Sequence, residues 1–158
     1  MPSHARWKSR LTRGNLDTYL PSAPFSAMKI LIVDDDRDVA DSLAALVRVV
    51  LDYDVCVRYS GESAISAAGE YRPDVVILDV NMPGLDGLQT ARILKTDRRL
   101  EGKTFIAHTA EDSVFVRKVA SRIGFHQVVA KGNTNGVSEL IDLLSDVEPS
   151  TRNQKQPR

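Results

Sequence analysis

Asp79 is the residue whose position in this sequence most strongly predicts chemistry. It directly follows the apolar run Val75–Leu78, and the turn residues Pro83 and Gly84 come soon after it. A short apolar run bounded in this way predicts a strand buried on both faces of a parallel sheet. Open α/β sheets bind ligands outside the carboxyl ends of such strands. Because a buried carboxylate is costly without a partner, Asp79 is expected to have a functional role.

Side chains of complementary chemistry follow three other apolar runs. Asp34 and Asp35 come after the first run, while Thr109 and Lys131 come after the fourth and fifth. Three neighbouring carboxylates need a cation to stay ionised, and hard oxygen ligands suit Mg²⁺. A hydroxyl and an ammonium opposite them suit a phosphoryl group, because both donate to its oxygens. The set predicts a site in which Asp79 acts as a nucleophile and forms an acyl phosphate.

The elements that must bring these residues together alternate regularly along the chain. Each strand-like run is followed by a segment with apolar residues at helical spacing. The predicted strands cover residues 30–33, 53–59, 75–78, 104–107 and 127–130. Such alternation implies parallel strands joined by right-handed crossovers. The expected fold class is therefore α/β, a flavodoxin-like doubly wound five-stranded parallel sheet of order 2-1-3-4-5 with helices on both faces.

Several single residues carry narrower predictions. Asp38 and Asp86 are predicted N-caps of the helices after the first and third strands, since a carboxylate there accepts backbone N–H groups. Asp36 is assigned to solvent or to a cap rather than to a metal. The histidines show no metal-ligand spacing, so His108 is interpreted as structural or exposed. For Phe115, on the fourth predicted helix, exposure to a partner and burial in the core both remain open.

Length and charge place the chain among single-domain globular proteins. The 158 residues are 42% hydrophobic and 27% charged, which suits one domain with a proper core. Residues 1–27 carry a net charge of +3 and are expected to be a disordered basic extension. Residues 28–148 carry −6 and form the predicted domain, and residues 149–158 are a polar basic tail of +3.

These totals exclude several classes of function. An acidic domain argues against nucleic acid as the main ligand. No apolar stretch approaches membrane-spanning length and no signal-peptide core is present, so no membrane partner is expected. Cys56 is the single cysteine, which fits a reducing compartment, and the predicted location is the cytoplasm.

From Met28 to Val147 the chain resembles the receiver domain of two-component response regulators, particularly the stand-alone chemotaxis type. The resemblance rests on four motifs in order at the family spacing, and residues 28–148 are therefore expected to be a receiver domain. The motifs are Ile-Leu-Ile-Val-Asp34-Asp35-Asp36, Leu-Asp79-Val-Asn-Met-Pro-Gly-Leu-Asp-Gly, Thr109-Ala110 and Lys131. Each motif alone is modest, but the four together are highly specific.

The resemblance implies a role for each residue of the predicted site. Asp79 would be the phosphoacceptor. Asp34 and Asp35 would hold Mg²⁺ together with Asp79 and the backbone carbonyl of Asn81. Lys131 would pair with Asp79 or with its phosphate.

The resemblance also implies that the loop after the fourth strand responds to phosphorylation and sets the lifetime of the acyl phosphate. Thr109 would bind a phosphoryl oxygen and draw this loop inward. Asn81 and Glu111 occupy the positions that tune hydrolysis of the acyl phosphate in this family. The small side chain of Ala110 would leave room for a phosphodonor.

Two residues depart from the family pattern. Val128 stands at the switch position, where the family usually has Tyr or Phe, and valine has few rotamers and little reach. Gly132 stands where the family usually has a cis-proline. Because a cis peptide bond before a residue other than proline costs about 3 kcal/mol, we expect a trans bond or a rearranged loop.

The resulting prediction is a single-domain response regulator of a phosphorelay. It would take a phosphoryl group from a sensor histidine kinase or a histidine phosphotransfer protein and signal to an unidentified downstream protein through a changed surface. No turnover of a separate substrate is expected, so the chain is not predicted to be an enzyme in that sense. One alternative is a receiver-like interaction module that acts without phosphorylation, which Val128 and Gly132 keep open. A small aspartyl-phosphate hydrolase is a third hypothesis.

Overall fold

The computed structural model describes residues 28–132 and 134–148. The predictions made for residues 1–27 and 149–158 lie outside this described part. The strands are β1 (Lys29–Val33), β2 (Asp54–Arg58), β3 (Val75–Leu78), β4 (Thr104–Thr109) and β5 (Gln127–Ala130). The helices are α1 (Arg37–Leu51), α2 (Gly61–Tyr71), α3 (Gly87–Leu94), the short 3₁₀ helix η2 (Arg98–Leu100), α4 (Val114–Ile123) and α5 (Thr134–Asp146).

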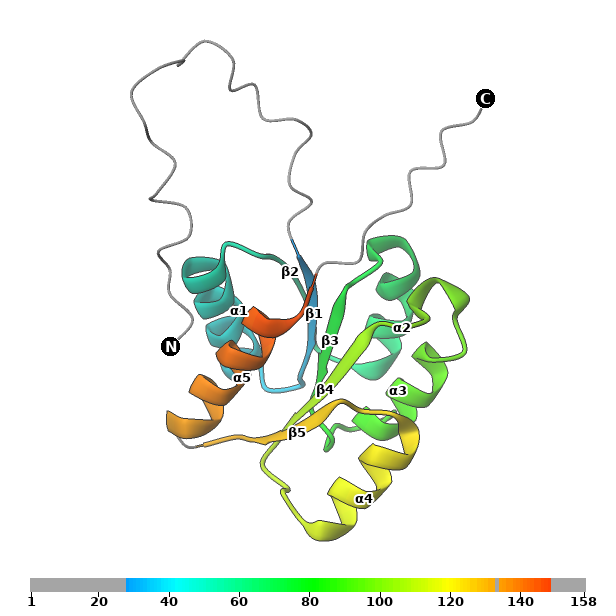
Figure 1. Ribbon diagram of the computed structural model, residues 1–158. Coiled ribbons are helices and arrows are strands. Elements are labelled where there is room, and N and C mark those ends of the chain that lie inside the picture. Colours follow the sequence, from blue (N-terminus) through cyan, green and yellow to red (C-terminus); the bar gives the residue numbers. More distant parts are fainter. Residues whose placement is uncertain (1–27, 133, 149–158) are drawn as a thin grey trace, which may run out of the picture.

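The strands form one parallel sheet of order β2-β1-β3-β4-β5, which confirms the predicted fold class (Figure 1). Helices α1 and α5 cover one face, and α2, α3 and α4 cover the other. The split follows from the alternation of side chains along each strand. In β1, for example, Leu31 and Val33 join the core under α2 to α4, whereas Ile30 and Ile32 join the core under α1 and α5.

Most helices begin at a capping side chain. The predicted cap Asp86 is confirmed, because its carboxylate accepts from the N–H of Gln89 and the Gln89 side chain accepts from the N–H of Asp86. The prediction that Asp38 caps α1 was wrong, whereas the assignment of Asp36 to solvent or to a cap is confirmed. Asp36 is the N-cap and accepts from the N–H groups of Asp38 and Val39. Asp36 has the extended backbone that a cap requires, while Asp38 already lies in the first helical turn.

No helix in the described ranges 28–132 and 134–148 is long and apolar enough to cross a membrane. The fold instead buries its apolar residues in the two layers on either side of the sheet, with every residue of β3 buried. Asp79 is the residue that follows this buried strand. The sheet thus delivers Asp79 to its own carboxyl edge, as the sequence predicted.

Candidate functional site

The predicted site residues lie together at the carboxyl edge of the sheet, because the strands that precede them are neighbours. Val33 is aligned with Leu78, and Leu78 with Ala107. Asp34 and Asp79 are therefore adjacent, and the N–H of Asp79 donates to the carbonyl of Val33 at 2.9 Å. On the other side, the N–H of Lys131 donates to the carbonyl of Thr109 at 2.9 Å.

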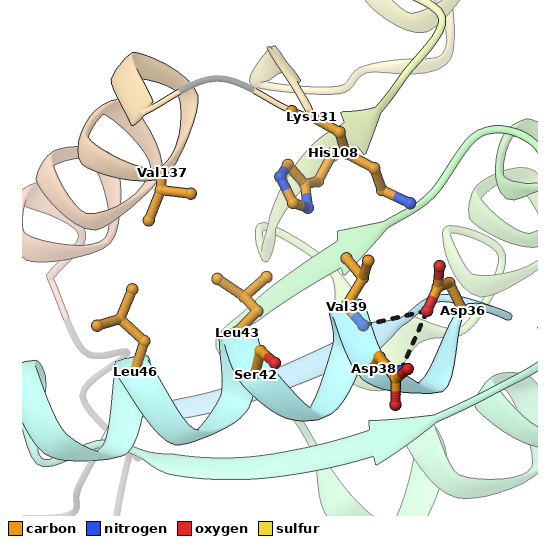
Figure 2. Close-up of a pocket in the computed structure, with 10 residues that line it drawn as sticks. Asp36, Asp38, Val39, Ser42, Leu43, Leu46, His108, Lys131 and Val137 are labelled. Carbon is orange, nitrogen blue, oxygen red and sulfur yellow. Dashed lines mark hydrogen bonds between the residues drawn. The ribbon is translucent and has the colours of Figure 1, made fainter.

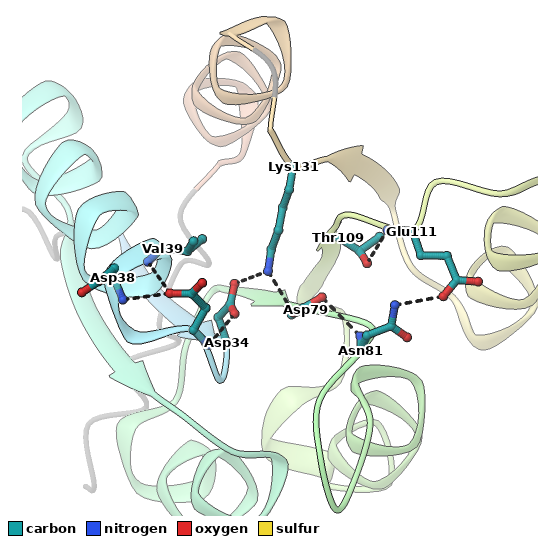
Figure 3. A network of polar contacts seen from close by, with 9 residues as sticks. Asp34, Asp38, Val39, Asp79, Asn81, Thr109, Glu111 and Lys131 are labelled. Atoms are coloured by element: carbon teal, nitrogen blue, oxygen red, sulfur yellow. Dashed lines mark hydrogen bonds and ion pairs between the residues drawn. The ribbon is translucent and has the colours of Figure 1, made fainter.

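Lys131 bridges the two buried carboxylates (Figure 3). Its Nζ lies 2.6 Å from Oδ2 of Asp34 and 2.8 Å from Oδ2 of Asp79. Burial alone would lower the pKa of Lys131, but the hydrogen bonds and charges of the two aspartates outweigh it and raise that pKa. For Asp34 the balance is opposite, since burial raises its pKa despite the pairing with Lys131. The site therefore carries more buried negative charge than one ammonium offsets.

The chemistry of the acidic cluster fits a divalent cation. One carboxylate oxygen from each of Asp34, Asp35 and Asp79 lies within 4.8 Å of the other two. Asp34 and Asp79 are buried, whereas Asp35 is exposed and leaves one side open to water. Hard oxygens from carboxylates and water are the ligands that Mg²⁺ prefers. The prediction for the Asn81 carbonyl stays a prediction, while the N–H of Asn81 donates to Oδ1 of Asp79 at 3.2 Å.

A hydrogen-bonded chain joins the loops after β3 and β4 across the mouth of the site. The Asn81 side chain donates from Nδ2 to Oε2 of Glu111 at 2.9 Å, and the N–H of Glu111 donates to Oγ1 of Thr109 at 3.2 Å (Figure 3). Thr109 is fully buried, while Asn81, Ala110 and Glu111 are exposed. The two predicted tuning residues thus contact each other and also connect Asp79 to Thr109.

The loop after β3 is held by a glycine and by a glutamate from another helix. A Cβ on Gly87 would lie 1.9 Å from the carbonyl oxygen of Asp79, so no larger residue fits there without moving the loop. The N–H of Gly87 donates to the carbonyl of Val80 at 2.9 Å. Glu62 of α2 accepts from the N–H of Leu85 at 3.2 Å. Sequence reasoning missed Glu62, because its contact depends on how α2 meets this loop.

The structure shows the surroundings of Val128 and the backbone conformation of Gly132, the two residues that depart from the family pattern. Val128 is buried in the core under α4, against a cluster that includes Phe125. Gly132 has φ +86°, and every peptide bond in the described residues is trans, as predicted for this loop. Glycine adopts such a positive φ without steric cost, so Gly132 turns the chain where the family has its cis-proline.

Sequence reasoning also left His108 without a role. His108 is buried beside the site on the α1 and α5 side, since it precedes Thr109 on β4 and points to the opposite face of the sheet. Burial, and secondarily the charge of Lys131, lowers the pKa of His108 to about 4. The period-2 alternation of β4 was the available signal for this placement.

Comparisons with known proteins agree with this geometry. The family model for the response regulator receiver domain matches residues 30–144. The DNA-binding response regulator MtrA of Mycobacterium tuberculosis and that of Mycobacterium leprae are each 39% identical over 69 residues. That match covers 44% of this chain and 30% of each relative, so the chain corresponds to only part of those proteins.

Solved structures show the same fold. The chemotaxis protein CheY4 of Vibrio cholerae has a TM-score of 0.71 at 23% identity, over 77% of this chain and 99% of that one. The receiver domain of Klebsiella pneumoniae RstA has a TM-score of 0.66 at 27% identity, over 74% of this chain and 95% of that one. Together with the family match over most of the described residues, these findings identify the chain as a member of the response regulator receiver domain family of two-component signalling.

Proposed function

We propose that this receiver domain accepts a phosphoryl group on Asp79 from a phosphohistidine of a sensor kinase or a histidine phosphotransfer protein. The observation that carries the proposal is the cluster of carboxylates that includes Asp79, two of which, those of Asp34 and Asp79, contact Lys131. Asp34 and Asp35 supply further carboxylates within 4.8 Å, and the Lys131 ammonium lies 2.8 Å from the Asp79 carboxylate. A nucleophilic carboxylate that lies beside an ammonium group and a candidate Mg²⁺ site is suited to forming an acyl phosphate.

Each side chain has a defined part in the proposed reaction. A carboxylate oxygen of Asp79 attacks phosphorus, and the bond to the donor imidazole nitrogen breaks as its electron pair returns to the ring. Asp34, Asp35 and Asp79 would hold Mg²⁺, which would neutralise the phosphoryl oxygens when bound. The Lys131 ammonium would donate a hydrogen bond to a phosphoryl oxygen. The buried Thr109 hydroxyl would turn to donate to it as well.

Loss of the phosphoryl group is proposed to be controlled at the mouth of the site. The Asn81–Glu111 hydrogen bond lies next to Asp79, because the N–H of Asn81 donates to Oδ1 of Asp79. An amide and a carboxylate there can orient an attacking water molecule, which favours a short-lived acyl phosphate. In this proposal the protein promotes its own phosphorylation and dephosphorylation and turns over no separate substrate.

The proposed output is a protein contact. The MtrA relatives are DNA-binding proteins, but the net charge of −6 on residues 28–148 favours a protein partner for this domain. Helix α4 begins with two exposed apolar side chains, Val114 and Phe115, directly after the loop that follows Thr109. This end of α4 is suited to a partner that distinguishes two states of the loop. We propose that this domain acts in the cytoplasm.

A second candidate is an interaction module that works without phosphorylation. Val128 favours it, because a buried β-branched side chain offers no ring that could move between two positions. The two candidates differ in a measurable way, since only the first requires partner affinity to change when Asp79 carries a phosphoryl group.

The proposal is tested by treating the protein with acetyl phosphate and Mg²⁺ and measuring its intact mass. We expect a gain of one phosphoryl group that hydroxylamine removes, as it does from acyl phosphates, and that is absent in Asp79→Asn. Asp38→Asn is the matched control, because Asp38 is an exposed aspartate in the first turn of α1, close in sequence to Asp34 and Asp35. An adduct in Asp79→Asn, or none in the wild type and in Asp38→Asn, would overturn the assignment.

A further inference from the structure

A pocket of about 570 Å³ lies between α1 and the start of α5, with Lys131 among its lining residues (Figure 2). Four apolar side chains supply most of its wall: Val39, Leu43 and Leu46 from α1, and Val137 from α5. The volume falls within the range of small-molecule pockets, and so does the lining, which is mainly apolar with a few polar groups.

The ring of His108 reaches into this pocket from the sheet. Figure 2 shows the imidazole beside Lys131 and facing Val39 and Leu43. His108 is only 6% exposed, and within the described residues its ring makes no hydrogen bond. Among the described residues, every buried side-chain nitrogen or oxygen that is sealed from solvent has a hydrogen-bond partner. The ring nitrogens of His108 have no such partner among these residues, so they are accessible from the pocket that His108 lines. The ring is thus more than nine-tenths buried, faces the pocket and has no hydrogen-bond partner among the described residues.

The charges around the pocket restrict what can fill it. The ammonium of Lys131 is engaged by Asp34 and Asp79, so only its aliphatic stem is presented to the pocket. Asp36 and Asp38 stand at the rim and disfavour anions. Because burial lowers its pKa, His108 is neutral near pH 7 and offers one donor and one acceptor.

From this arrangement we infer that the pocket binds a small uncharged ligand with an apolar ring and a hydroxyl group that hydrogen-bonds to His108. The apolar body fills the space between Leu43, Leu46 and Val137, and the hydroxyl satisfies the imidazole. Such a ligand also contacts the Lys131 stem and Gly132, which places it next to the strand end that carries the site lysine. The inference requires no phosphorylation of Asp79, so it stands or falls separately from the proposed function.

The test uses three matched probes and methyl-detected NMR titration. 4-Ethylphenol carries the ring and the hydroxyl, ethylbenzene lacks the hydroxyl, and 4-ethylbenzoate carries a negative charge. We expect 4-ethylphenol to shift the methyl signals of the four apolar wall residues, with ethylbenzene binding about threefold to tenfold more weakly, as expected for one lost hydrogen bond. 4-Ethylbenzoate should bind more weakly still. His108→Phe should remove the preference for 4-ethylphenol over ethylbenzene.

His126→Phe is the control, because His126 is an exposed histidine next to β5 that does not line this pocket. It should leave all three affinities unchanged. Equal affinity for the phenol and ethylbenzene, tighter binding of the benzoate, or an unaltered preference in His108→Phe would overturn the inference. So would an absence of shifts at the pocket methyls. Concentration-dependent shifts of the same methyls without any probe would assign the pocket to a second copy of the chain and would also overturn it.

Discussion

Removing the Lys131 ammonium should destabilise the metal-free protein strongly, and Mg²⁺ should reverse much of that loss. Lys131 is the cation contacted by both Asp34 and Asp79, and the exposed fractions of the three side chains are 14%, 3% and 9%. Substitution by methionine keeps the aliphatic stem and deletes the charge. Breaking a buried ion pair by deleting one partner costs about 3 to 5 kcal/mol. We expect Lys131→Met to fall near 3 kcal/mol, because Asp35 leaves one side of the cluster open to water.

The magnesium dependence follows from the geometry. In the wild type the Lys131 Nζ lies within 2.8 Å of both carboxylates that would hold the cation, so the two cations compete for the same oxygens. In Lys131→Met this competition is gone. A ligand that binds only the folded state at 100 times its dissociation constant stabilises it by about 2.7 kcal/mol. Mg²⁺ should therefore stabilise the variant more than the wild type.

The assay is urea unfolding followed by far-UV circular dichroism, once with EDTA and once with millimolar Mg²⁺. Lys103→Met is the matched control, because Lys103 contacts Asp74 at 3.0 Å with comparable exposed fractions of 15% and 13%, away from the acidic cluster. Its loss of stability should be the same with and without Mg²⁺. Adding Asp34→Asn to Lys131→Met should recover part of the stability in EDTA, since it removes one of the stranded charges.

Two results would refute this reasoning. A loss below about 1 kcal/mol for Lys131→Met in EDTA would mean that the bridge behaves as an exposed ion pair. An equal loss in EDTA and in Mg²⁺ would mean that Lys131 and the cation do not share Asp34 and Asp79.

Two further predictions concern residues close to this bridge. Because the pKa of His108 is about 4 when folded and near 6.5 when unfolded, the unfolded state takes up the proton first as the pH falls. The free energy of unfolding should therefore decline between pH 6.5 and pH 4 by up to about 3 kcal/mol. Urea unfolding at pH 7.5 and at pH 5 should show a smaller decline in His108→Phe than in the wild type. Equal declines in the two proteins would refute the assignment. Gly87→Ala should lower both stability and phosphorylation, since its Cβ would meet the Asp79 carbonyl at 1.9 Å. Gly102→Ala, with no atom within 4 Å of its Cβ but a positive φ, should lower stability alone.

The order of the sheet and the edge that carries the site could be predicted because each depends on short patterns. Apolar runs of four or five residues mark the buried strands, and a polar residue directly after such a run must lie at the carboxyl edge. Asp79 and Lys131 were found in this way although they are 52 residues apart. The pattern needs no knowledge of the loops, because the strands alone fix these positions.

Contacts made by loop side chains could not be predicted, because they depend on the path of two loops at once. The Asn81–Glu111 hydrogen bond joins residues 30 apart in the chain. Glu62 reaches the N–H of Leu85 only because α2 meets the loop after β3 at this point. The N-cap of α1 failed for a related reason: Asp36 and Asp38 both suit a cap, and the extended backbone at Asp36 decides between them.

The same loop contacts bear on how a signal could leave the site. Val128 is held in the core by its neighbours, so the usual inward movement of an aromatic ring is absent from this chain. The hydrogen bond from the Glu111 N–H to Thr109 offers a different route. If the Thr109 hydroxyl turns toward a phosphoryl group on Asp79, it can no longer accept that bond in the same geometry. We then expect the loop to shift at Glu111, close to the exposed Phe115 at the start of α4. Because Val128 stands in place of the usual aromatic residue on β5, we expect the structural response to phosphorylation at the start of α4 rather than at β5.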